Sequence, residues 1–281
     1  MTRHGATKGI KGVTGVTALR NKYGSFSTVS AGGGGSNGVA GYVAGGYDSA
    51  NISGIDKVSF PADTKTTLSA TLTTARQYAS GFANSSVAGY VAGGTDSANI
   101  SGIDKVSFPA DSKTTLSATL TTARQLPAGF ANSGVAGYVA GGYDSGYTSG
   151  IDKVSFPADS KTTLSVTLTT ARYASAGFAN SGVAGYVAGG SDSGGRISGI
   201  DKVAFSTDTK TTLSATLTSA SRFAAPFANS GVAGYVAGGD NGSNISGIDK
   251  VAFSADNKTT LTATLTTARQ LVAGFADSGT L

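Results

Sequence analysis

The hydrophobic positions of this chain fall in short runs that recur at a nearly constant spacing. The run GYVAGG starts at five places, at spacings of 48, 48, 48 and 49 residues: Gly41, Gly89, Gly137, Gly185 and Gly234. An Ile-Asp-Lys run and an arginine return with a similar period: Ile55, Ile103, Ile151, Ile200 and Ile248, and Arg76, Arg124, Arg172, Arg222 and Arg269. The pattern predicts five repeats, which start near residues 39, 87, 135, 183 and 232.

Each repeat divides into four runs of β-forming residues. In the first repeat these runs are residues 39–44, 54–60, 67–76 and 79–84. Within 67–76, Leu68, Ala70 and Leu72 alternate with serine and threonine, which is the period of a half-buried strand. Four short strands per repeat favour a β-propeller over a β-helix, whose coils are shorter. The expected fold class is therefore all-β, with five four-stranded blades in a ring.

The ends of the repeat region indicate how the ring closes. Counted outward from the ring axis, the run before the double glycine is the second strand of its blade, so the first blade lacks an innermost strand. Residues 272–278 repeat the strand that precedes each GYVAGG run, and we expect this C-terminal strand to complete the first blade. The rival interpretation is a sixth blade begun by residues 13–30, where VTGVTALR echoes LSATLTTAR, although two of its four strands would be missing.

The order of motifs within a repeat resembles the kelch repeat over roughly residues 36–281. Four elements of the first repeat carry this resemblance: Gly45-Gly46, Ile55-Asp56, Pro61-Ala62-Asp63 and Ala75-Arg76. The large aromatic residue of kelch repeats, usually Trp, is missing near Thr67 and Leu68, so the blades must pack through smaller residues. The Gly, Ala, Ser and Thr-rich composition is similar to kelch-like repeats of bacteriophage and cyanophage virion proteins. This second resemblance implies a virion component.

Charge separates the N-terminal segment from the repeats. From residue 36 onward sixteen Lys and Arg balance sixteen Asp, so the net charge of +5 lies in the first 35 residues. The basic residues there are Arg3, Lys8, Lys11, Arg20 and Lys22. We therefore expect residues 1–35 to form a basic, Gly-rich arm and residues 36–281 to form the propeller. Either the arm docks onto other virion proteins, or it is a solvated leader.

The remaining composition limits localisation and partners. The N-terminus has no continuous apolar stretch of signal-peptide length, and no segment approaches the roughly 18 apolar residues of a membrane span. We expect neither a signal peptide nor membrane insertion, and the resemblance implies a virion protein, or a soluble extracellular one after release. The neutral repeat region argues against nucleic-acid binding.

Differences between the repeats are concentrated in two segments, one after the double glycine and one after the closing arginine. In a propeller both connections emerge on the same face, so this variable face is the expected ligand-binding surface. Its candidate ligand-binding residues are Tyr47, Asp48, Tyr78, Asp96, Tyr143, Asp144, Tyr147, Tyr173, Asp192, Arg196, Phe223, Asp240 and Asn241. Aromatic rings beside short polar groups suit the sugars of a cell-surface glycan, and they suit protein surfaces equally well; a face without a ligand is the third alternative.

Metal, cofactor and catalytic roles find little support. Asp48 and its counterparts could be calcium ligands, but each loop holds a single Asp, apart from Asp240 with Asn241, so turn capping is the favoured interpretation. Asp56, Lys57 and the closing arginine are expected to form structural ion pairs. The chain has no Cys or Glu and only one His, His4. We expect no metal, no cofactor and no enzyme, and the alternative of a hydrolase would depend on Asp240.

These expectations combine into a functional hypothesis. The chain is expected to be a non-enzymatic binding or structural protein, in a phage tail fibre, receptor-binding or other host-attachment component. The first alternative is a capsid-decorating or purely structural virion protein. The second is an intracellular kelch-type scaffold for protein interactions.

Overall fold

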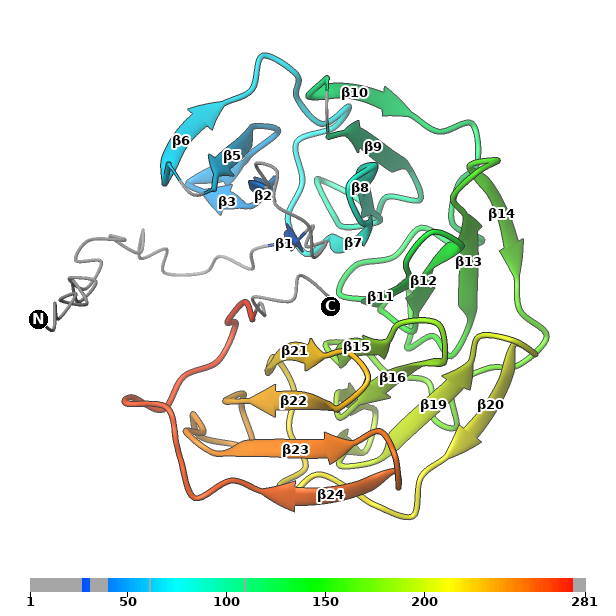
Figure 1. The fold of residues 1–281 in the computed structure, drawn as a ribbon, viewed down its shortest axis with the longest axis vertical. Helices are drawn as coiled ribbons and strands as arrows, with labels where there is room; N and C mark the ends of the chain where they lie inside the picture. Colours follow the sequence, from blue (N-terminus) through cyan, green and yellow to red (C-terminus); the bar gives the residue numbers. More distant parts are fainter. Residues whose placement is uncertain (1–26, 31–39, 61, 109, 275–281) are drawn as a thin grey trace, which may run out of the picture.

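The chain forms five four-stranded antiparallel sheets arranged as the blades of a β-propeller, as Figure 1 shows. The structure is a computed structural model, and it describes residues 27–30, 40–60, 62–108 and 110–274. Each blade consists of successive β-runs of the chain, and each strand is antiparallel to its neighbours. The predicted all-β class and the count of five blades are confirmed.

The blades are named one to five in chain order, and their strands are given from the ring axis outward. Blade one consists of β1 (Ser27–Ser30), β2 (Ala40–Ala44), β5 (Ile55–Ser59) and β6 (Thr64–Thr67). Blade two consists of β7 (Ser80–Asn84), β8 (Ala88–Ala92), β9 (Ile103–Ser107) and β10 (Ser112–Thr115). Blade three consists of β11 (Ala128–Asn132), β12 (Ala136–Ala140), β13 (Ile151–Ser155) and β14 (Ser160–Thr163).

Blade four consists of β15 (Ala176–Asn180), β16 (Ala184–Ala188), β19 (Ile200–Ala204) and β20 (Thr209–Thr212). Blade five consists of β21 (Ala225–Asn229), β22 (Ala233–Ala237), β23 (Ile248–Ala252) and β24 (Asn257–Thr260). Two short hairpins lie in the connections between second and third strands: β3 (Tyr47–Asp48) with β4 (Ala50–Asn51), and β17 (Ser191–Asp192) with β18 (Gly195–Arg196).

The fourth strand of each blade is shorter than the alternating pattern predicts. In blade one, β6 ends at Thr67, so the predicted strand over 67–76 is wrong beyond that residue. The backbone then makes one hydrogen bond at every fourth residue, with lengths of 2.8, 2.8 and 3.1 Å: Leu68 N–H to Ile55 O, Leu72 N–H to Ser53 O and Arg76 N–H to Ile52 O. Leucines four residues apart fit a period of two and a period of four alike, which is why the alternation was misleading.

The first blade is completed from the N-terminal side, which corrects the predicted closure. β1 pairs with β2, and Val29 lies opposite Tyr42 as Phe82 lies opposite Tyr90 in blade two. β1 therefore holds the position that was expected for residues 272–278, of which 275–278 lie outside the described residues. Instead, an added Cβ on Gly274 would lie 2.5 Å from the carbonyl oxygen of Pro226, so the last described residues run beside β21. A strand close in sequence pairs at lower entropic cost than one from the far end of the chain.

β1 also bears on the arm and on the rival sixth blade. Residues 27–30 lie within the segment assigned to the arm and within the segment 13–30 of the rival blade, yet they pair in blade one. Residues 13–26 and the basic residues of the arm lie outside the described residues, as do residues 275–278.

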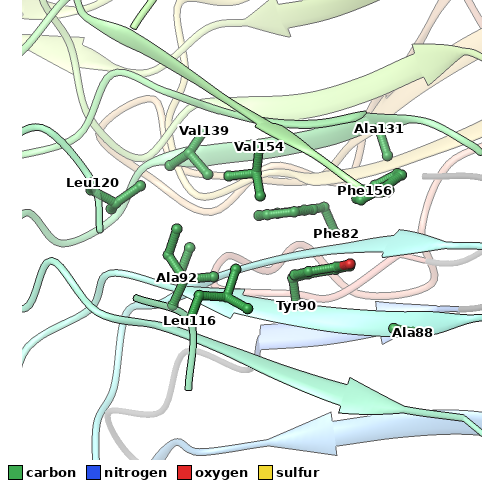
Figure 2. Close-up of a cluster of buried hydrophobic side chains, with 11 residues drawn as sticks. Phe82, Ala88, Tyr90, Ala92, Leu116, Leu120, Ala131, Val139, Val154 and Phe156 are labelled. Carbon is green, nitrogen blue, oxygen red and sulfur yellow. The ribbon is translucent and has the colours of Figure 1, made fainter. Parts of the chain in front are cut away.

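The hydrophobic core consists of separate clusters, each lying between two neighbouring blades. Figure 2 shows the cluster between blades two and three, to which blade two contributes Phe82, Tyr90 and Leu120 and blade three contributes Val139 and Phe156. The centroids of the Phe82 and Tyr90 rings lie 5.2 Å apart, and those of Tyr90 and Phe156 lie 5.1 Å apart. Equivalent clusters join blades one and two, three and four, and four and five. Phe and Tyr thus supply the large side chains between the blades, where smaller residues were expected.

A polar layer closes each of these four junctions. A tyrosine and a lysine of one blade share an aspartate in the turn before the fourth strand of the next blade. Between blades two and three, Lys105 lies 2.6 Å from Asp159, and the Tyr90 hydroxyl donates to the same carboxylate at 2.9 Å. The other three lysine–aspartate pairs have similar distances, from 2.6 to 2.7 Å: Lys57–Asp111, Lys153–Asp208 and Lys202–Asp256.

The closing arginines form buried ion pairs between blades, which confirms their predicted structural role at three junctions. The pairs are Arg76–Asp104 at 2.6 Å, Arg124–Asp152 at 2.9 Å and Arg172–Asp201 at 2.9 Å. All six side chains are at most 2 % exposed. Charges so deeply buried are tolerated only because each is paired.

We predict that the four junction tyrosines ionise at a higher pH than ordinary tyrosines. Burial, together with the hydrogen-bonded aspartate carboxylate, raises the pKa of Tyr42, Tyr90, Tyr138 and Tyr186 well above the usual value. Because their folded pKa is raised, the stability they contribute is fully present below about pH 10 and is lost as the pH rises further. In an ultraviolet titration of tyrosinate, four of the eleven tyrosines should ionise only as the protein unfolds.

A denaturant-unfolded sample is the control for this titration, and all of its tyrosines should ionise together near pH 10. Tyr90→Phe should remove one late-titrating group. A folded protein whose eleven tyrosines ionise in a single step near that pH would contradict the assignment.

Candidate binding site on the variable face

The variable segment at the end of one repeat is hydrogen-bonded to the variable segment after the double glycine of the next repeat. The residue after, or at, the closing arginine pairs with the residue after the double glycine of the next blade: Gln77 with Thr95, Gln125 with Tyr143, Tyr173 with Ser191 and Arg222 with Asp240. The Gln125 and Tyr143 backbones, for example, exchange N–H to O bonds of 3.0 and 2.9 Å. The prediction that both segments emerge on one face is therefore confirmed.

An open ring of four backbone hydrogen bonds curves around the propeller axis on this face. It joins five equivalent residues with φ between 54° and 58°: Tyr78, Leu126, Ala174, Phe223 and Leu271. Each of the last four donates its N–H to the carbonyl oxygen of the one before it, at 2.8 to 3.0 Å. Four residues of this ring, Leu126, Ala174, Phe223 and Leu271, line a cavity of about 130 Å³, together with Pro127 and Ser175. The axial end of the face is thus a depression that is lined mostly by apolar residue types but exposes more polar than apolar surface.

Four aromatic side chains from blades three to five gather beside the depression. Tyr143 and Tyr147 come from the loop after the double glycine of blade three, and Tyr173 and Phe223 follow blades three and four. The ring centroids lie 5.6 Å apart for Tyr143 and Tyr147, 5.6 Å for Tyr147 and Tyr173, and 6.3 Å for Tyr173 and Phe223. Tyr147 is 38 % exposed, so part of this aromatic cluster faces solvent.

An ionic cluster borders the aromatic one. Nη2 of Arg196 lies 3.0 and 2.9 Å from the two carboxylate oxygens of Asp240, and Nε of Arg222 lies 3.0 Å from one of them. The Gly242 N–H donates to the same carboxylate at 2.8 Å. Two guanidinium groups therefore share one carboxylate.

Arg222 joins the aromatic and ionic clusters. It donates a hydrogen bond to the Tyr173 hydroxyl, and its guanidinium carbon lies 4.9 Å from the centroid of the Phe223 ring. Burial alone would raise the pKa of Asp240, but the Gly242 N–H and both arginines lower it overall, so this carboxylate is ionised at neutral pH. A general acid needs a raised pKa, and Asp240 has the opposite shift.

Two departures of the fourth repeat, an inserted glycine and a displaced arginine, build this ionic cluster. The extra glycine at 194–195 forms the β17–β18 hairpin, which carries Arg196. Ser221 takes the backbone position of a closing arginine, because its carbonyl accepts the Gly190 N–H at 2.8 Å as Arg172 accepts that of Gly142. Ser221 therefore replaces the closing arginine, and Arg222 is the next residue, on the variable face, so the sequence comparison was wrong to align it with the closing arginines. The spacing was the available signal, because Ser221, not Arg222, lies 48 residues before Arg269.

The other predicted site residues lie outside these clusters. Asp48 is exposed on the β3–β4 hairpin with Tyr47, and Asp96 accepts a hydrogen bond from Asn51 at 3.0 Å. Asp192 accepts the Gly194 N–H at 2.8 Å, which confirms turn capping at that position. The remaining three are placed as follows: Tyr78 in the axial backbone ring, Asp144 half-buried in the blade-three loop and Asn241 exposed in the blade-five loop. Within the described ranges, no three Asp or His side chains gather as metal ligands do.

The sequence matches no protein-family profile and no curated protein. In the part of the chain that the structure describes, no helix is long and apolar enough to cross a membrane. Function is therefore inferred from the chemistry of the variable face.

Proposed function

We propose that the protein is a non-enzymatic binding protein that holds carbohydrate on the variable face, at the aromatic and ionic clusters of blades three to five. The proposal rests on the observation that the differences between the repeats come together at one place on this face. The aromatic substitutions of repeats three and four, the inserted glycine and displaced Arg222 of the fourth repeat, and the unusual Asp240 loop meet at one place, while the rest of the repeats stays nearly identical. Differences among repeats that serve only a scaffold have no reason to converge.

The chemistry favours a sugar that carries a carboxylate. Tyrosine faces stack on the apolar face of a pyranose ring, and hydroxyl and amide groups nearby bond its hydroxyls. Arg196 and Arg222 share only Asp240, and Nε of Arg196 is buried without a hydrogen-bond partner among the described residues. The two guanidinium groups therefore retain donors and positive charge for a second anion, such as a uronic or sialic acid carboxylate.

The kelch-like and phage-like resemblances supply the biological setting of the proposal. A glycan-binding face and a separate basic N-terminal arm suit a tail-fibre or receptor-binding component, in which residues 1–26 would dock onto other virion proteins. The arm's charge also fits a capsid-decorating role, in which the variable face would have no glycan ligand.

Glycan binding is tested by a multivalent array with the purified protein. We expect binding to glycans with uronic or sialic acids, and at least about 10-fold weaker binding to their methyl esters, which lack the charge. Tyr147→Ala should reduce binding at least about 10-fold, because its exposed ring is one of the stacking surfaces.

Tyr47→Ala is the matched control, since Tyr47 lies in the equivalent loop of blade one, away from the aromatic cluster. It should leave glycan binding unchanged. Absence of binding at high multivalency, or equal losses in the two tyrosine variants, would reject the proposed site.

A further inference from the structure

Each buried arginine of the first three blade junctions occupies a polar site between two blades, which we call the arginine site. The aspartate of the later blade binds the arginine at 2.6 to 2.9 Å. Backbone carbonyl oxygens of the same blade also accept hydrogen bonds from it, at 3.0 to 3.2 Å: Gly93 and Gly102 for Arg76, Val139 for Arg124 and Val187 for Arg172. The arginine site thus consists of one carboxylate and several carbonyl oxygens, which suits a guanidinium group.

The junction between blades four and five keeps this site but lacks its arginine. In each of the first three junctions the arginine lies three residues after the threonine that donates to the aspartate, and the residue three after Thr218 is Ser221. Arg222 is the next residue, and it lies on the variable face. Among the described residues, Asp249 therefore has only Lys258 as an ion-pair partner, at 3.6 Å.

A cavity of about 60 Å³ lies at this fourth arginine site. Its lining includes Asp249 and the equivalents of Val139, Gly93 and Gly102, which are Val236, Gly238 and Gly247. Ser221 lines the cavity as well, so the cavity takes the place of the missing arginine side chain. A single buried water needs about 10 to 15 Å³, so there is room for a group of several heavy atoms such as guanidinium.

The aspartate in this cavity has one hydrogen bond fewer than its counterparts. Oδ2 of Asp249 accepts only the Thr218 N–H among the described residues, at 2.8 Å. Oδ2 of Asp152, in contrast, accepts both a threonine N–H and the arginine. The side chain of Asp249 is 11 % exposed, against at most 1 % for the three aspartates that bind an arginine. A charged acceptor is therefore open to a ligand that enters from solvent.

We propose that this cavity binds a guanidinium group from outside the chain. Two sources supply such a group, a free guanidinium compound and an arginine side chain of a partner protein. The first three junctions show that the equivalent oxygens accept a guanidinium at 2.6 to 3.2 Å. A calcium ion fits less well, because it takes about six to eight oxygens and favours several carboxylates, whereas this cavity has one. Guanidinium binding here is independent of glycan binding on the variable face.

Thermal unfolding with a low concentration of guanidinium chloride tests this site. At about 20 mM, far below the molar concentrations that denature proteins, guanidinium should raise the melting temperature by at least about 2 °C relative to equal concentrations of sodium or potassium chloride. The reason is that a ligand that binds only the folded state stabilises it. N-acetylarginine amide is the second probe. Stabilisation by both probes would identify an arginine side chain as a fitting source, and stabilisation by guanidinium alone would identify a small free compound.

Three variants locate the effect. Ser221→Arg should melt at a higher temperature than the wild type and should lose the response to guanidinium, because the chain's own arginine then fills the cavity. Asp249→Asn should bind guanidinium at least about 10-fold more weakly in calorimetry, and it should still fold because no buried arginine pairs with Asp249. Ser214→Arg, the same substitution at an exposed position of the same segment, should leave the response unchanged.

Two results would overturn this assignment. One is a wild type that guanidinium fails to stabilise beyond sodium or potassium at the same concentration. The other is a Ser221→Arg variant that folds and keeps the full response, because the guanidinium would then bind elsewhere on the protein.

Discussion

Replacing Asp152 by Asn should lower the free energy of unfolding by about 3 to 5 kcal/mol, which is the usual cost of breaking a buried ion pair from one side. Asp152 is fully buried, and its carboxylate accepts from Arg124 at 2.9 Å and from the Thr121 N–H and hydroxyl at 3.0 and 2.6 Å. The variant would leave the Arg124 guanidinium, 2 % exposed, without the carboxylate that pairs with it directly. Chemical denaturation of the two proteins measures the difference.

The pH dependence of that difference is a second readout. Burial alone would raise the pKa of Asp152, but the hydrogen bonds from Thr121 and the charge of Arg124 lower it below the usual range. A lowered folded pKa means that the stability from this group is present above about pH 4 and is lost as the pH falls further. The difference in the free energy of unfolding between wild type and Asp152→Asn should therefore be constant near neutral pH and become smaller in acid.

Asp56→Asn is the matched control, because Asp56 occupies the same position in blade one. Its side chain is 45 % exposed and pairs with Lys65 at 3.2 Å, with no arginine against it. An exposed pair of this kind contributes at most about 1 kcal/mol. Equal losses for the two variants would show that burial between blades does not set the strength of these pairs.

Most of the fold could be predicted from the repeat pattern. Five near-identical copies of four β-runs leave few alternatives to a propeller, and the recurrence of Ile55-Asp56 and Arg76 in every copy pointed correctly to structural ion pairs. The pairs join different blades, so neither partner is close in sequence. The ion pairs could be predicted only because the same charged residues recur in every repeat.

What the repeats could not show was where the pattern breaks. β1 does not resemble the other innermost strands in sequence, since Val29 stands where they have Phe, so the better-matched residues 272–278 were preferred wrongly. Arg222 looked like its counterparts until Ser221 was seen in the backbone position of the arginine. Both errors arose because residues were aligned by type, whereas the structure depends on which backbone groups pair with each other.

The sequence predicted which face of the propeller carries the candidate site, but not which part of that face. Variable residues were expected around the whole ring, and six of the thirteen candidates converge over blades three to five: Tyr143, Tyr147, Tyr173, Arg196, Phe223 and Asp240. Side chains from three blades meet there because Arg196 and Arg222 reach across to the blade-five loop. Whether a side chain can contact the loop of another blade depends on where the backbone places it, and the sequence of a single repeat does not show this.

Replacing Gly185 by Ala should destabilise the protein by about 3 kcal/mol, at the upper end of the usual cost of overpacking. The added Cβ would lie 2.1 Å from two ring atoms of Phe130, which is fully buried and stacked on Tyr138 at 5.2 Å between centroids. Neither ring has space to retreat, so blades three and four must separate. Thermal or chemical denaturation measures the loss.

Gly41→Ala makes the same change where, among the described residues, no ring of a preceding blade packs on the glycine, and its effect on the free energy of unfolding should have the opposite sign. The nearest atom to the new Cβ would be Cζ of Phe60 at 3.5 Å, an ordinary contact with an exposed side chain. Without a clash, an alanine restricts the unfolded chain and stabilises the protein by up to about 1 kcal/mol. If both variants lose stability equally, the cost at Gly185 comes from the strand itself. If only Gly185→Ala loses it, the cost comes from the neighbouring blade, and the glycine of each GYVAGG run is required by the phenyl ring packed against it.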